Sequence, residues 1–305
     1  MSRGIGEFEL VQGAIPEWLA VFVAVLTQLG DVWFLSVLVA VVYWTRTDRR
    51  DDVAVVAGVT LAGFAFMAAL KHVFALPRPD QPLLPAEELP TLIQPLYEAT
   101  ATAAGYGFPS GHALMTTVVY LSLVDLLAIG SRRSRLAGAI SIITLVSVSR
   151  IALGVHYLVD IVAGVGLGLV FLAVTAALVS SRPSDRATIA FALAVGLGGL
   201  NLLVSGVTAN ALVLAGASLG AFGGWQLVVF GRRLRATDHL STAAWHLLTR
   251  AALAVAALVP LFAALGTFEF FSAGALGGLV GLGVATLLAL PFASRSIASG
   301  TGSRQ

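Results

Sequence analysis

The chain has 305 residues, of which 58% are hydrophobic and only 11% are charged, and its mean hydropathy is +0.92. This composition excludes an ordinary soluble domain and predicts an integral membrane protein with several spans. The net charge of +2 does not indicate a nucleic-acid partner, because the arginines gather in short loops between apolar runs. The absence of cysteine excludes disulfides and thiolate metal sites.

The apolar runs predict an all-α, polytopic transmembrane helical bundle. A bilayer core about 30 Å thick needs about 20 mostly apolar residues per helix. We expect spans near residues 32–46, 53–74, 111–130, 136–153, 157–181, 187–206, 209–230, 246–267 and 272–293. The earlier stretch 15–29 is either an in-plane interfacial helix or part of another span, and the sequence leaves both alternatives open.

Arginine distribution predicts the orientation of the bundle. If each span crosses once, the arginine-bearing connections share one side, which the positive-inside rule makes cytoplasmic. These connections carry Arg46, Arg49, Arg50, Arg132, Arg133, Arg135, Arg182, Arg186, Arg232, Arg233 and Arg235. Lys71, Arg78 and Arg150 fall on the opposite side together with Arg3. We therefore expect a functional site on the non-cytoplasmic side, in the cell membrane.

The first motif is Lys71-x6-Arg78-Pro79, and Lys71 is the only lysine of the chain. Taken alone, Lys71 fits a snorkelling residue at a helix end, and Arg78 fits an ordinary loop cation. The connection that follows, residues 76–109, is rich in proline and polar residues and joins two motifs. Long loops are commonly functional, so we expect a lid or a wall of the site, with a passive surface loop as the alternative.

The second motif is Pro109-Ser110-Gly111-His112, which directly precedes an apolar run. Ser110 is well placed as an N-cap or first-turn residue, and backbone N–H groups at a helix start bind anions. The N–H groups of Ser110, Gly111 and His112 are therefore expected to point towards a phosphate. A plain helix cap would explain Ser110, but it leaves His112, a candidate proton donor, unexplained.

The third motif is Ser149-Arg150-x5-His156-x3-Asp160. A spacing of four places His156 and Asp160 on one face of a helix, where the carboxylate would orient the imidazole as a nucleophile or base. A structural hydrogen bond between helices is the alternative. Arg150 falls where one span ends, and its guanidinium suits phosphate oxygens. Gly164 and Gly168 continue the same face and would admit a close neighbouring helix.

The three motifs, in this order and with these spacings, resemble the type 2 phosphatidic acid phosphatase superfamily, which shares its site with vanadium-dependent haloperoxidases. The resemblance covers roughly residues 30–182. It implies metal-independent hydrolysis, without a cofactor, through a phosphohistidine. His156 would attack phosphorus, Asp160 would orient His156, and His112 would protonate the leaving group. The phosphoryl oxygens would be bound by Lys71, Arg78, Ser110, Gly111 and Arg150.

This resemblance divides the chain into a phosphatase-like core of about six helices, residues 1–185, and an extension of about four spans, residues 186–305. In the extension, Gly274, Gly277, Gly278 and Gly281 form small-xxx-small pairs that suit close helix packing. Outside the motifs, His72 is expected to be peripheral, and His239 and His246 to lie on the cytoplasmic side. No cluster of acidic or histidine residues suggests a metal site.

The leading hypothesis is a membrane lipid phosphatase that acts on a lipid phosphomonoester or a polyprenyl diphosphate. Its partners would be the phosphorylated lipid substrate and the surrounding membrane lipids, and the oligomeric state stays open. The alternatives are a lipid phosphotransferase with an alcohol acceptor, a lipid transporter or scramblase that uses charged residues as a pathway, and vanadate-dependent halide oxidation.

Overall fold

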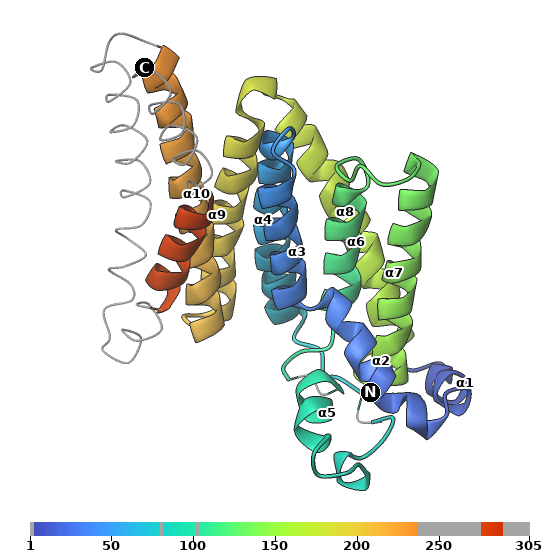
Figure 1. Cartoon of the computed structure of the whole chain (residues 1–305). Helices are drawn as coiled ribbons and strands as arrows, with labels where there is room; N and C mark the ends of the chain where they lie inside the picture. The colour runs from blue at the N-terminus through green and yellow to red at the C-terminus, as the bar shows by residue number, and fades with distance from the viewer. Residues whose placement is uncertain (1–2, 80–81, 102–103, 237–275, 289–305) are drawn as a thin grey trace.

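The computed structural model describes residues 3–79, 82–101, 104–236 and 276–288. Throughout these ranges the chain forms helices and loops and no strand, which confirms the all-α prediction. Long helices run side by side, and short helices gather at one end of the bundle (Figure 1). Among the described residues, five helices are long and apolar enough to cross a membrane, and a bent pair raises the number to as many as six. The protein is therefore a polytopic integral membrane protein.

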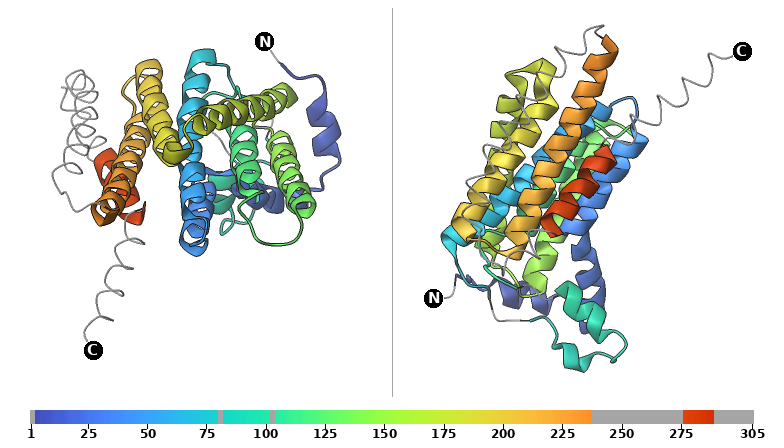
Figure 2. Two further views of the ribbon diagram at one scale, coloured as in Figure 1. Left: turned by 90° about the horizontal axis from the view of Figure 1, so that it is seen from above. Right: turned by 90° about the vertical axis from the view of Figure 1, so that its left-hand side faces the viewer.

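The main helices lie at most of the predicted spans. They are α3 (Val32–Thr45), α4 (Arg50–Phe74), α6 (Gly111–Leu123), α7 (Arg132–Ala152), α8 (Leu158–Ser180), α9 (Arg186–Ser205) and α10 (Ala209–Ala236). Of these, α3 and α6 have only 14 and 13 residues, respectively. A further apolar helix covers Leu276–Leu288, within the predicted span 272–293. The predicted span 246–267 lies outside the described residues. Seen from above, α4 lies between α9 and α10 on one side and α6 to α8 on the other (Figure 2).

The predicted span 111–130 is wrong in its length. Helix α6 has only 13 residues, which corresponds to about 20 Å and is shorter than a bilayer core. After Leu123 the chain turns at the arginine-rich end of the bundle, where Asp125 contacts two arginines. Its carbonyl oxygen accepts a hydrogen bond from Arg49 at 3.0 Å, and its carboxylate binds Arg132 at 2.8 Å.

The short elements are α1 (Glu7–Gly13), η1 (Glu17–Leu19), α2 (Ala20–Leu26), η2 (Thr27–Gly30), η3 (Ala86–Glu88), α5 (Gln94–Ala101) and η4 (Pro183–Asp185). Helices α2 and η2 continue into α3 across a bend of 51°. Residues 20–30 thus form the first arm of a bent pair, and both alternatives for residues 15–29 stay open. Ala20 and Ala24 of α2 are buried in a small apolar cluster with Tyr97 of α5 and Leu153, so the short helices share a core of their own.

The direction of each helix places the motifs at one end of the bundle. Arg50 begins α4 and Lys71 lies in its last turn, while Arg132 begins α7 and Arg150 lies in its last turn. The motif of Ser110 stands at the start of α6. As predicted, the motif residues and the arginine-bearing connections thus occupy opposite ends.

Glycines set the distance between α8 and α6. A Cβ atom on Gly164 would lie 2.7 Å from the Ser110 carbonyl oxygen, and one on Gly168 would lie 3.0 Å from that of Leu114. A side chain does not fit at 2.7 Å, and at 3.0 Å the backbone of α6 would have to move by a few tenths of an ångström. The expectation of a close neighbouring helix is therefore confirmed. The contact fixes the second motif, on α6, against the third motif, which leads into α8.

Glycine packing also joins the last described helix to α10. A Cβ atom on Gly216 or Gly220 would collide with the backbone of Gly277 or Gly281, respectively. The close packing predicted from the small-xxx-small pairs is therefore confirmed at Gly277 and Gly281. Gly278 has open space around it, and Gly274 lies outside the described residues.

The α6–α8 contact generates a stability prediction with an internal control. Gly168→Val should destabilise the protein by about 1–3 kcal/mol, because the added methyl groups cannot be accommodated against α6. Gly166→Val, two residues away, should have little effect, because Gly166 has nothing within 4 Å of the added Cβ. Thermal unfolding of both variants in detergent measures the difference. Equal melting temperatures would show that α6 and α8 do not pack this closely.

Candidate active site

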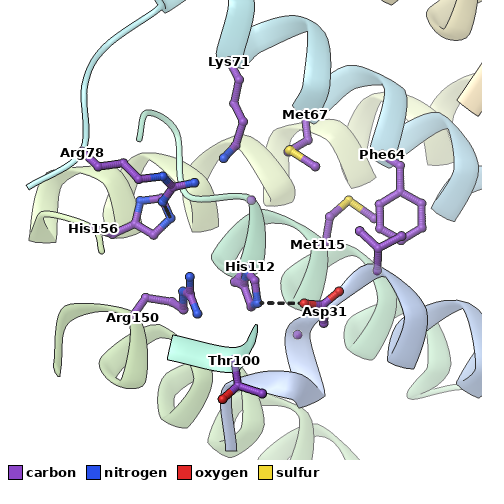
Figure 3. A pocket seen from close by; sticks show the side chains of 13 residues that line it. Asp31, Phe64, Met67, Lys71, Arg78, Thr100, His112, Met115, Arg150 and His156 are labelled. Atoms are coloured by element: carbon purple, nitrogen blue, oxygen red, sulfur yellow. Dashed lines mark hydrogen bonds and ion pairs between the residues drawn. The ribbon is translucent and has the colours of Figure 1, made fainter. Parts of the chain in front are cut away.

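The motif residues converge on one cavity at the end of the bundle. The cavity has a volume of about 250 Å³, and the ends of α4 and α7, the start of α6 and the loop before α8 surround it (Figure 3). Six of the eight predicted site residues line it: Lys71, Arg78, Gly111, His112, Arg150 and His156. Ser110 and Asp160 are fully buried and do not line the cavity. Asp160 contacts His156, which lines it, and Ser110 contacts Asp160.

His156 and Asp160 come together in a way that differs from the prediction. His156 lies in the loop before α8, and Asp160 lies in the first turn of that helix, so the pair does not share a helix face. The loop instead folds back over the helix start. His156 Nδ1 lies 3.4 Å from Asp160 Oδ2, and the same oxygen accepts the Tyr157 backbone N–H at 3.0 Å. This carboxylate therefore both caps α8 and orients the imidazole.

The second ring nitrogen of His156 faces the positive side of the cavity. His156 Nε2 lies 2.9 Å from Arg78 Nη1, and the side chain is buried. Burial, followed by the charges of Arg78, Arg150 and Lys71, lowers the pKa of His156 well below its ordinary value. The imidazole is therefore neutral. With its proton on Nδ1, facing Asp160, Nε2 presents a lone pair.

The three cations of the cavity are held mainly by backbone carbonyl groups. Lys71 Nζ donates to the Tyr106 carbonyl oxygen at 3.1 Å. Arg78 donates to the carbonyl oxygens of Gly105 at 3.1 Å and Val155 at 3.0 Å.

Arg150 is 2% exposed, and its Nη1 donates to the Thr27 hydroxyl at 3.0 Å. Within the described ranges, no carboxylate forms an ion pair with Lys71, Arg78 or Arg150. Their positive charge is therefore oriented but not neutralised, as a site for a phosphate dianion requires.

Ser110 is the N-cap of α6, as predicted, and its hydroxyl oxygen accepts the Ala113 N–H at 3.4 Å. Its own N–H donates to the Asp160 carbonyl oxygen at 2.9 Å, so the expectation that this N–H points to a phosphate is wrong. Ser110 instead ties the second motif to the third. The N–H groups of Gly111 and His112 are in the first turn, where a helix supplies no acceptor, and both residues line the cavity.

The connection between the first two motifs is a wall of the cavity, so the passive-loop alternative is wrong. Its ends are joined by a hydrogen bond of 2.7 Å from Gly107 N to the Leu76 carbonyl oxygen. Within it, Arg78 and Thr100 of α5 line the cavity. The opposite part of the cavity is apolar and is lined by Val32, Phe64, Met67 and Met115.

Two residues at the N-terminus of the chain reach the site without any motif to indicate them. Arg3 Nη2 lies 3.2 Å from Asp160 Oδ1 and donates to the Pro77 carbonyl oxygen at 2.9 Å. Glu7 accepts the Leu158 N–H at 3.1 Å, at the start of α8. The only sequence signal was the position of Arg3 on the same side as the motif cations.

Of the three remaining histidines, only His72 lies within the described residues. His72 bonds to the Ala68 carbonyl oxygen at 2.9 Å and does not line the cavity. His239 and His246 lie outside the described residues. Among the residues that are described, no group of three or more His, Asp or Glu side chains is arranged to hold a metal ion.

Comparison with known proteins agrees with this geometry. Residues 52–184 match the model of the PAP2 superfamily, and all three motifs fall within that segment. No curated protein and no solved structure matches the chain. The residues from the N-terminus to α3 that reach the site lie outside the matched segment. The family predicted from the motifs is confirmed for residues 52–184, which match the PAP2 superfamily within an integral membrane protein, and this match supports a phosphatase-type function.

Proposed function

We propose that the protein hydrolyses a lipid phosphomonoester or a polyprenyl diphosphate through a phosphohistidine at His156. The observation that carries the proposal is the orientation of this one side chain. Nδ1 of His156 is directed at Asp160 at 3.4 Å, and Nε2 faces the cationic cavity beside Arg78 at 2.9 Å. An imidazole fixed in this way is a nucleophile aimed at whatever the cations bind.

In the first step, His156 Nε2 attacks phosphorus and the bond from phosphorus to the leaving oxygen breaks. The electron pair of that bond stays on the leaving oxygen, which takes a proton from His112. As the substrate enters, the Arg78 N–H that points at His156 Nε2 donates its hydrogen bond to a phosphoryl oxygen instead. Lys71 and Arg150 bind the other phosphoryl oxygens and stabilise the charge that develops in the transition state.

In the second step, water hydrolyses the phosphohistidine. His112, now neutral, takes a proton from water while the water oxygen forms a bond to phosphorus. The bond between phosphorus and Nε2 breaks, and its electron pair returns to His156. Asp160 stabilises the positive charge that the ring carries while it is phosphorylated. Phosphate leaves, and both histidines are restored.

The division of the cavity supports a lipid substrate. Lys71, Arg78 and Arg150 supply a cationic half, and Phe64, Met67 and Met115 line the other half. Phe64 lies seven residues before Lys71 on α4, which places it about 10 Å deeper in the bundle. An amphiphile with a phosphate head and an apolar tail matches both halves, and methionine side chains adapt to chains of different shape.

The positive-inside rule supports a site on the non-cytoplasmic side. The arginine-bearing connections lie at the end of the bundle opposite the cavity, and such connections face the cytoplasm. We therefore place the cavity at the outer face of the cell membrane, where it would act on lipids of the outer leaflet.

Substitution of the nucleophile tests the proposal. His156→Ala should abolish phosphate release from phosphatidic acid, phosphatidylglycerol phosphate or a polyprenyl diphosphate, measured with purified protein in the presence of a chelator. His72→Ala should retain activity, because His72 does not line the cavity. Wild-type activity should withstand the chelator, because no step uses a metal ion.

Three outcomes would contradict the proposal. Phosphate release by folded His156→Ala would exclude this residue as the nucleophile. Loss of wild-type activity in chelator would show that the reaction depends on a metal. If folded wild-type protein released phosphate from none of the substrates, phosphotransfer to an alcohol or lipid transport would explain the site better.

The lowered pKa of His156 gives a prediction that does not depend on turnover. A histidine whose pKa is lowered keeps its neutral form as the pH falls through the ordinary histidine range. In protein labelled with 15N-histidine, the signal that disappears in His156→Ala should therefore remain that of a neutral ring with Nδ1 protonated. A signal that becomes imidazolium within or above the ordinary range would contradict the assigned environment.

A further inference from the structure

Asp31 places a carboxylate in the wall of the cationic cavity. It lies at the bend between η2 and α3, before the segment that matches the family, and no motif includes it. Its Oδ2 lies 4.0 Å from Nε2 of His112, and Figure 3 shows the two side chains directed at one another across the cavity. His112 Nε2 is buried and makes no hydrogen bond within the described structure.

Helix capping does not account for this carboxylate. Asp31 is the N-cap of α3, a position where aspartate normally accepts a backbone N–H of the first turn. Its side chain makes no such bond. Only its backbone serves the helix, since its carbonyl oxygen accepts the Leu35 N–H at 3.0 Å. The side chain is left to face the cavity, which Asp31 lines.

The backbone around Asp31 is packed onto the imidazole that its side chain faces. A Cβ atom on Gly30 would lie 2.7 Å from Val146 Cγ1 and 3.0 Å from His112 Cδ2, so the chain passes against the ring where no side chain would fit. The segment is also anchored from both sides. Tyr120 donates to the Leu29 carbonyl oxygen at 2.9 Å, and the Thr27 hydroxyl holds Arg150 at 3.0 Å.

The chemistry proposed for His112 requires such a carboxylate. A general acid must carry a proton when the leaving oxygen departs, but the cations around the cavity oppose a positive charge on this ring. The ionisable groups that line the cavity with His112 are Lys71 from α4, Arg78 from the long connection, Arg150 from α7, His156 from the loop before α8, and Asp31. Asp31 is the one among them that favours imidazolium over imidazole.

We propose that Asp31 is the positioning residue of His112, matching what Asp160 is for His156. It would hold the Nε2–H bond and thereby leave Nδ1 to carry the proton for the leaving oxygen. The distance of 4.0 Å is too long for a hydrogen bond. The bond would form in the substrate complex, where catalytic hydrogen bonds tighten. Asp31 takes up no proton in this scheme: the proton moves from His112 to the leaving oxygen in the first step, and from water to His112 in the second. This inference rests on the proposed phosphatase function.

The test compares two leaving groups, because only a basic one needs the proton of His112. The probes are dodecyl phosphate, whose alkoxide is a poor leaving group, and a nitrophenyl phosphate that carries the same chain, whose phenolate leaves without a proton. Asp31→Asn keeps a residue that suits an N-cap but removes the charge. The variant should lose about tenfold more kcat/KM on the alkyl ester than on the aryl ester. This parameter reports cleavage of the ester bond and leaves out the later hydrolysis of the phosphohistidine, which both esters share.

Two further variants separate a loss caused by His112 from the general effect of replacing an N-cap aspartate and from misfolding. Asp185→Asn is the matched control, because Asp185 is also an N-cap whose side chain makes no capping bond, in this case on α9, and it should leave both substrates unaffected. Asp31→Ser, which again suits an N-cap, should repeat the selective loss if Asp31→Asn does not fold.

A double-mutant cycle tests whether Asp31 acts through His112. His112→Gln removes the general acid, and adding Asp31→Asn to it should cause no further loss on the alkyl ester. Equal loss on both esters in Asp31→Asn, or the same factor of loss with and without His112, would overturn the inference. If wild-type protein hydrolysed the aryl ester alone, it would have no general acid to position, which also overturns it. Failure of wild type on both esters would instead refute the proposed function.

Discussion

The site depends on keeping three positive charges together without neutralising them, one buried (Arg150) and two half-buried (Lys71 and Arg78). Lys71, Arg78 and Arg150 line one cavity, and burying unpaired charge is costly. A carboxylate partner for each would offset that cost but would also compete with a phosphate. The structure uses carbonyl and hydroxyl oxygens instead, from Tyr106, Gly105, Val155 and Thr27. Such dipoles orient the donors and offset part of the desolvation, and they leave a net positive charge for an anion.

The two aspartates of the site fit the same constraint. Asp160 and Asp31 each lie beside one histidine, at 3.4 Å and 4.0 Å, respectively, and neither forms an ion pair with Lys71, Arg78 or Arg150. Each carboxylate can therefore act on the proton of one imidazole while these three cations keep their charge. Arg3, which lies 3.2 Å from Asp160, adds a positive charge behind the pair of His156 and Asp160, so the N-terminal segment takes part in holding that pair.

Sequence reasoning succeeded where a local signal specified the structure. Apolar length predicted α4, α7, α8, α9 and α10, and residue type predicted Ser110 as an N-cap. It failed where tertiary contacts determine the position of a residue. The spacing of His156 and Asp160 suggested one helix face, yet the chain turns at Gly154, whose φ is +68°, and Asp160 caps the next helix. Arg3 and Asp31 carry no periodic or motif signal, because only tertiary contacts bring them to the cavity.

The most direct test of this account is to identify the residue that carries the phosphoryl group during turnover. Wild-type protein should be mixed with a lipid phosphate that it hydrolyses, quenched rapidly in base, and analysed by mass spectrometry. The account predicts an acid-labile phosphate on His156 that is absent from His156→Ala. Phosphate on a different residue, or steady turnover with no phosphorylated histidine, would contradict it.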